Sequence, residues 1–307
     1  MSFHLLSSHP PGMVGTRSNA SQISGRKDGD AVDRVPTSSP RRRATWRLAW
    51  SCAALSAVLV CGGCGHLEGS KSISHGRRVL VFSKTLGYRH ASITNGITAI
   101  RQLGREHGFA MEATEDSAVF TSENLARFQA VIFLSATGDI LNPEQEAAFR
   151  NYVLGGGGFA AIHGAVFGPN ACEDKWAWYG DAFCCAFSNH SAILPAHVLI
   201  EDGSQPSTKG LPACWSRTDE WYNFTGTPRG CARILARMDE TTYKGGAMAA
   251  DHPIAWCRRL GKGRMWYTAM GHTESSFSEP LFLQHMLGGI QTAAGWKPAK
   301  FGVNRKP

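Results

Sequence analysis

Four histidines in this chain lie next to segments whose composition predicts buried β-strands. His90, His163 and His272 each follow such a segment, and His252 precedes one. In an open α/β sheet, ligands bind in the crevice outside the carboxyl ends of the strands, so side chains from distant parts of the sequence can converge there. Imidazole is the side chain best suited to proton transfer or metal ligation near neutral pH. The pattern therefore predicts a small-molecule site.

The segment around His163 gives the sharpest local signal. Ala161-Ile162-His163-Gly164-Ala165 resembles a nucleophile elbow, the sharp turn that exposes one side chain at the top of a sheet. That side chain is an imidazole here, which argues against a covalent acyl-enzyme. Acid–base catalysis, ligand hydrogen bonding and metal ligation stay open, and for His90 a structural role as a helix cap stays open too. No local zinc motif such as H-x-x-x-H occurs, so a divalent metal such as zinc would need convergence of His90, His163 and His272.

A second group of polar residues stands beside aromatic ones, in the run Asp219-Glu220-Trp221-Tyr222-Asn223-Phe224. Adjacent residues of an extended segment point to opposite sides, so we expect only one of the two carboxylates to face a site. Carboxylates bind hydroxyl groups and aromatic rings stack on the apolar faces of sugars, which makes a sugar site one interpretation. An aromatic core cluster with a solvated acid is the other.

Other cofactor motifs are missing from the sequence. The dinucleotide fingerprint G-x-G-x-x-G is absent, and the run of glycines at 155–158 precedes a strand and lacks the Gly-Lys-Ser/Thr of a phosphate loop. We interpret this run as the end of a helix.

The elements that must position these residues alternate regularly in the first half. Apolar runs predict strands at residues 78–82, 109–114, 130–134 and 159–162, and helical spacing predicts helices at 93–107, 121–125 and 143–154. This order predicts a parallel, doubly wound sheet. The second half predicts strands at 196–201 and 232–238, a hairpin of 254–257 with 264–269, and a closing helix at 280–294. One domain over residues 77–296 is the simplest organisation, with a linker at 65–76 and a tail at 297–307.

The residues before this domain predict export. Arg41-Arg42-Arg43 and Arg47 precede thirteen apolar residues, too few for a transmembrane helix, and small residues then lead to Cys64. This order predicts a signal peptide at 41–64 of the lipoprotein type, with Cys64 as the lipid anchor in the periplasm or at the cell surface; plain secretion, a retained anchor and a twin-arginine signal stay open. Residues 1–40 predict disorder, or a start codon assigned too far upstream.

Charge and cysteines narrow the remaining classes. Residues 1–64 hold eight Lys/Arg and three Asp, so +5 of the net charge of +8 lies there and +3 in the other 243 residues. The domain therefore has no basic stripe for nucleic acid. Six cysteines fall within the domain, which favours disulfides in an exported protein, but the pairing and the oligomeric state do not follow from the sequence.

Taken together, the order of these pieces resembles that of the trehalose-utilisation (ThuA-like) family over essentially all of residues 77–296. The matching pieces are Gly87-Tyr88-Arg89-His90, Thr137-Gly138-Asp139, Ile162-His163-Gly164-Ala165, Trp176-Ala177-Trp178-Tyr179, Asp219-Glu220-Trp221-Tyr222, Asp251-His252-Pro253-Ile254-Ala255-Trp256 and Gly271-His272-Thr273. The resemblance implies a class I glutamine amidotransferase-like fold, a flavodoxin-like three-layer α/β/α sandwich with a mostly parallel sheet. In glutaminase relatives the elbow carries a cysteine, and His163 takes that place here.

The resemblance also implies a function in carbohydrate catabolism, with trehalose or a 3-keto-glycoside as the small-molecule partner. We expect an enzyme of the hydrolase, lyase or isomerase type whose catalytic residues are His163, His272, Asp219 and Glu220. Substrate contacts are expected from Tyr88, Arg89, His90, Asp139, Trp178, Tyr222 and His252. The alternative is a non-catalytic carbohydrate-binding lipoprotein on the same scaffold. Residual glutaminase activity through Cys184 or Cys185 ranks last.

Overall fold

The computed structural model describes residues 76–167 and 177–304. In the first half, strands β1 (Arg78–Phe82), β2 (Ala110–Thr114), β3 (Ala130–Leu134) and β4 (Gly158–Ile162) alternate with helices α1 (Ile93–His107), α2 (Ser122–Leu125) and α3 (Pro143–Gly155). Local chemistry sets the helix ends. Asn142 and Gln145 form a capping box before α3, and Gly108 ends α1 in the left-handed conformation. The predicted β-α-β-α order of this half is confirmed.

The second half contains α4 (Ala177–Phe183), β5 (Ala186–Ile200), β6 (Cys214–Thr225), β7 (Arg233–Asp239), β8 (Pro253–Leu260), β9 (Gly263–Thr268) and α5 (Pro280–Ala294). The predicted hairpin is β8–β9, and the closing helix is α5. Strand β5 is much longer than the segment predicted at 196–201. It pairs with β6, of which the sequence indicates only an extended segment around Asp219.

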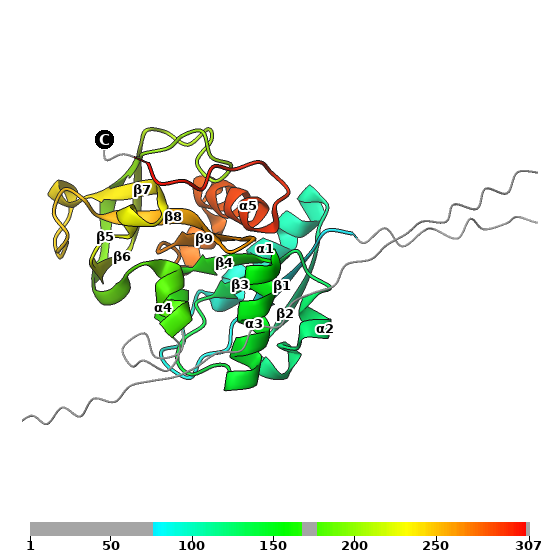
Figure 1. The fold of residues 1–307 in the computed structure, drawn as a ribbon. Helices are drawn as coiled ribbons and strands as arrows, with labels where there is room; N and C mark the ends of the chain where they lie inside the picture. The colour runs from blue at the N-terminus through cyan, green and yellow to red at the C-terminus, as the bar shows by residue number, and fades with distance from the viewer. Residues whose placement is uncertain (1–75, 168–176, 305–307) are drawn as a thin grey trace, which may run out of the picture. The chain divides into compact units, whose positions relative to one another are not determined.

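All nine strands form one sheet in the order β2-β1-β3-β4-β9-β8-β7-β5-β6. The first five strands in this order are parallel, and the other four pair in antiparallel fashion, on the left in Figure 1. Strands β1, β3, β4 and β9 are neighbours, so their carboxyl ends meet at one edge. This edge is where the histidines that follow β1, β4 and β9 emerge.

Helices cover both faces of the parallel half and make the three-layer α/β/α arrangement that was predicted (Figure 1). Helices α1 and α5 pack on one face, where the Cβ of an alanine at Gly96 would touch Leu134 of β3. On the other face, Phe149 of α3 and Tyr179 of α4 pack against Phe133 and Phe159 of the sheet. Burial of these large rings on both faces stabilises the sheet and fixes its edge.

The expected signal peptide, the disordered leader and nearly all of the linker lie outside the described residues. Within residues 76–167 and 177–304, none of the helices is both long and apolar enough to span a bilayer.

Candidate active site

Three histidines meet at the carboxyl edge of the parallel strands. His90 follows β1, His163 follows β4 and His272 follows β9, and one ring nitrogen from each lies within 4.8 Å of the other two. The rings pack edge to face, with centroids 4.6 to 5.2 Å apart. We call these three residues the histidine cluster. The convergence expected from their positions after the strands is therefore found in the folded chain.

His163 is the most constrained member of the cluster. It is fully buried and has φ of 51°, in the left-handed region that a residue with a side chain rarely adopts. Its Nδ1 lies 2.6 Å from the carbonyl oxygen of Ala269, so Nδ1 carries the proton and donates it there. The Nε2 atom is then an acceptor that faces the cluster. A backbone carbonyl on the far nitrogen is the usual way in which a metal-ligating histidine is oriented.

His90 lies against the turn that carries His163. A Cβ atom on Gly164 would stand 2.8 Å from Cε1 of His90, so only glycine lets the two segments approach so closely. His90 is 5 % exposed, and its Nδ1 is buried without a hydrogen-bond partner. A buried polar nitrogen costs free energy when it is unpaired, which favours a ligand that supplies the missing contact.

His272 lies on the loop after β9, and hydrogen bonds to Asp219 fix the backbone of that loop. The carboxylate of Asp219 accepts hydrogen bonds from the backbone N–H groups of Gly271 (2.8 Å) and His272 (3.0 Å) and from the guanidinium of Arg217 (2.7 Å). Gly271 has φ of 113°, which suits glycine. Asp219 was expected to be catalytic, and its oxygens are hydrogen-bonded to the backbone of this loop and to Arg217, a geometry that suits positioning of the loop.

Glu220 points to the cluster instead, as the alternation of the strand requires. Its Oε2 lies 3.1 Å from Nδ1 of His272 and 3.6 Å from Nε2 of His163, and its Oε1 lies 3.0 Å from Nδ1 of His190. The sequence gives no sign that His190, on β5, belongs to this site. Its half-exposed ring lies at the cluster because β5 extends far enough to pair His190 with Tyr222.

Tyr222 closes the cluster from the side of β6. Its hydroxyl donates to Nε2 of His163 at 2.8 Å, and burial raises the pKa of this hydroxyl well above its ordinary value, so it stays protonated. His252, expected to touch substrate, lies behind this strand. Its Nε2 donates to the carbonyl of Tyr222 at 2.7 Å, and its Nδ1 lies 2.7 Å from Glu240. His252 therefore supports Tyr222.

The environment separates the protonation states of the three histidines. Burial lowers the pKa of His90 to about 4 and that of His163 well below its ordinary value, with the neighbouring histidines adding to the effect. The hydrogen bond to Glu220 raises the pKa of His272. His90 and His163 are therefore neutral at pH 7, the form in which imidazole binds a metal.

The remaining expected substrate contacts lie outside the cluster. Arg89 is exposed and forms a bidentate ion pair with Glu115 at 2.7 and 3.1 Å. Asp139 is exposed. Burial and, after it, the charge of Asp139 raise the pKa of Glu146, so Asp139 lies near the start of α3. Trp178 packs against Phe149 of α3. Tyr88 is different, since its exposed ring lies 4.8 Å from that of His90.

Comparison with known proteins identifies the family. The model of the trehalose utilisation family, ThuA, matches residues 78–293. The chain belongs to the ThuA family. Two solved ThuA-like proteins have the same fold, one from Bacteroides uniformis (22 % identity, TM-score 0.61, 71 % of this chain and 91 % of that chain) and one from Parabacteroides merdae (18 %, 0.58, 75 % and 92 %). No curated protein matches the chain.

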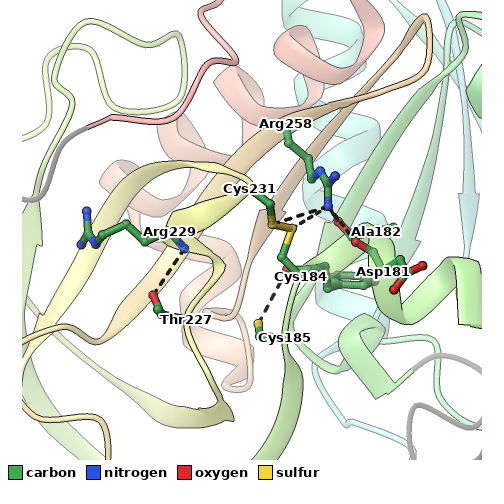
Figure 2. Close-up of a disulfide and its surroundings, with 9 residues drawn as sticks. Asp181, Ala182, Cys184, Cys185, Thr227, Arg229, Cys231 and Arg258 are labelled. Carbon is green, nitrogen blue, oxygen red and sulfur yellow. Dashed lines mark hydrogen bonds between the residues drawn. A yellow bond between two sulfur atoms is a disulfide. The ribbon is translucent and has the colours of Figure 1, made fainter.

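Cys184 and Cys185 do not provide a nucleophile at the elbow of this ThuA protein. Cys184 forms a disulfide with Cys231, and this bond joins the end of α4 to the turn before β7 (Figure 2). Burial raises the pKa of the neighbouring Cys185 thiol to about 12, so it is not a thiolate at neutral pH. Neither residue thus supports the glutaminase alternative.

Proposed function

We propose that this ThuA protein is an enzyme that acts on a sugar or an oxidised glycoside at the histidine cluster. The observation that carries the proposal is the convergence of three histidine nitrogens within 4.8 Å at the edge where α/β sheets bind ligands. The Glu220 carboxylate stands 3.1 Å from one of these histidines and is itself only slightly exposed. The family description, trehalose utilisation, supports a carbohydrate substrate.

A divalent cation such as zinc fits the cluster. Nitrogens around one tetrahedral zinc lie roughly 3.3 Å apart, from Zn–N bonds of about 2.0–2.1 Å. Nε2 of His163 and Nδ1 of His272 are 3.1 Å apart, and the three ring nitrogens of the cluster lie within 4.8 Å of one another. To bind the ion, Nδ1 of His272 would give up its hydrogen bond to Glu220. Three histidines leave the fourth position open for an oxygen of the substrate or for water, which is the arrangement of catalytic zinc sites. Such an ion polarises a bound oxygen and stabilises negative charge on it.

The chain's own residues then have distinct tasks. His163 and His90 are neutral and would hold the ion, and the Tyr222 hydroxyl, which donates to Nε2 of His163 in the free site, would release that nitrogen to it. Glu220 is the group placed to take a proton from a bound water or sugar hydroxyl, because one oxygen faces the cluster while the other faces His190. Asp219 keeps His272 in place from outside the site.

Export belongs to the same proposal. The disulfide between Cys184 and Cys231 forms readily in an oxidising compartment, which agrees with the predicted signal peptide and the lipid anchor at Cys64. The test is metabolic labelling with a fatty acid in a bacterial host, with Cys64→Ser as the comparison. If the wild-type chain is labelled and Cys64→Ser is not, the result supports a lipid anchor at Cys64. Equal labelling of the wild type and Cys64→Ser contradicts that anchor.

Turnover of trehalose and 3-keto-trehalose by the full-length chain tests the function, with and without a chelator. We expect turnover that falls by roughly 10²- to 10⁴-fold in Glu220→Gln, because a positioned acid–base group contributes about that much. His107→Ala is the matched control, since His107 is exposed at the end of α1. Sugar binding without turnover would favour the non-catalytic alternative. Turnover that survives both the chelator and His163→Ala would overturn the role of the cluster.

A further inference from the structure

The described part of the chain exposes few large apolar side chains, and two of them lie beside residues of the candidate site. The four are Leu86 (63 % exposed), Tyr88 (67 %), Ile193 (49 %) and Val303 (57 %). Leu86 and Tyr88 belong to the loop between β1 and His90, and Ile193 belongs to β5. Single exposed apolar residues are common, whereas apolar residues gathered around a polar site are typical of a ligand-binding surface.

Tyr88 stands in a loop that is held rigidly. The backbone N–H groups of Leu86 and Gly87 donate to the carbonyl of Thr137 at 2.7 and 3.2 Å, and the Thr137 hydroxyl donates to the carbonyl of Tyr88 at 2.8 Å. The Tyr88 ring lies edge to face with His90, at 4.8 Å between centroids. An exposed ring fixed in this way contacts a ligand at little entropic cost.

Ile193 borders the site from the other side. It pairs directly with Glu220 across the antiparallel strands β5 and β6, so both side chains stand on the same face of the sheet. The same face carries His190 opposite Tyr222. The site thus combines polar groups at its centre, namely the histidines and Glu220, with apolar groups on the β1–α1 loop and on β5.

We propose that Tyr88 and Ile193 are substrate-binding residues that contact the apolar ring faces of a pyranose whose hydroxyl groups reach the histidine cluster. This inference rests on the proposed function and narrows its substrate class to closed sugar rings. A pyranose has both a flat face of C–H groups and a rim of hydroxyls, which this distribution of side chains matches. An open-chain polyol has the hydroxyls and lacks the flat face.

Binding of three probes to the full-length chain tests the inference: trehalose, methyl α-D-glucopyranoside and the open-chain sorbitol, by isothermal titration calorimetry. We expect both pyranosides to bind and sorbitol to bind at least about tenfold more weakly. Tyr88→Ala and Ile193→Ala should each weaken pyranoside binding by about three- to tenfold, because an aromatic or aliphatic contact of this size contributes that much. Tyr88→Phe keeps the ring and should retain binding.

Val303→Ala is the matched control, because Val303 is equally exposed and lies in the C-terminal tail. In turnover assays the two site variants should raise KM and leave kcat within about twofold, since the contact is the same in ground and transition states. If Tyr88→Ala and Ile193→Ala bound the pyranosides as tightly as Val303→Ala does, the inference would be overturned and the proposed function would stand. Equal binding of sorbitol would overturn the restriction to sugar rings. Failure of the wild-type chain to bind either pyranoside would overturn the inference, and turnover of 3-keto-trehalose would then decide the proposed function separately.

Discussion

Replacing Asp219 by asparagine should lower the stability of the folded protein. Its neighbour in the sequence, Glu220, belongs to the candidate active site, whereas Asp219 anchors the loop that carries His272. The side chain is fully buried and its carboxylate accepts from Gly271, His272 and Arg217. Asparagine keeps the shape but loses the charge, and its NH₂ group faces donors instead of acceptors. Removing one partner of a buried ion pair costs about 3–5 kcal/mol, and we expect the lower end because Arg217 keeps its second ion pair with Glu279.

The expected loss is about 3 kcal/mol for Asp219→Asn, which corresponds to a fall in Tm of roughly 6–12 °C for a domain of this size. Thermal unfolding followed by circular dichroism measures it. Asp116→Asn is the matched control, because Asp116 is an exposed N-cap and asparagine caps equally well. Glu220→Gln should melt near the wild type and lose activity. If Asp219→Asn melted within about 2 °C of the wild type, its carboxylate would not be the anchor of the His272 loop.

Three further predictions concern groups outside the histidine cluster. Burial lowers the pKa of His285 to about 4, below its ordinary value of 6.5, so the folded protein keeps this ring neutral while the unfolded chain binds a proton as the pH falls below 6.5. The free energy of unfolding of the wild type, measured with urea, should therefore fall by about 2 kcal/mol more than that of His285→Leu between pH 7 and pH 5. Replacing both Cys184 and Cys231 by serine opens a loop with a separation of 47 residues and should cost about 4 kcal/mol under oxidising conditions, with no difference from the wild type in reductant. His252→Gln should lower kcat more than it raises KM, because His252 contacts the backbone of Tyr222; a raised KM with unchanged kcat would instead place His252 against the substrate.

The parallel half of the fold and the histidine cluster could be predicted from sequence because both depend on local rules. Short apolar runs alternate with helical spacing, and parallel strands end at a common edge. His90, His163 and His272 follow their strands immediately, so their convergence required no knowledge of side-chain geometry. The turn at His163 was also visible, since a strand followed by His-Gly signals a sharp change of direction.

The antiparallel half could not be predicted in the same way. The pairing of β5 with β6 contains register shifts, one of them between His190 and Ile193. This irregular register decides that His190 and Ile193 stand beside Tyr222 and Glu220. His190 stands in a polar stretch of the sequence, and nothing in that stretch indicates its partner strand. The roles of Asp219 and His252 were also hidden, because only the folded chain shows that their partners are backbone groups. The strand predicted at residues 196–201 overlaps only the carboxyl end of β5, and the missing amino-terminal part is the part that carries His190 and Ile193.

Metal content of the purified full-length chain tests the central claim most directly. Mass spectrometry of the protein after exposure to zinc and extensive dialysis should find about one divalent ion per chain in the wild type and in His107→Ala. His163→Ala and His272→Ala should each retain far less while keeping a cooperative thermal transition. A wild-type chain that holds no more metal than these two variants would contradict the proposal that the histidine cluster is a metal site.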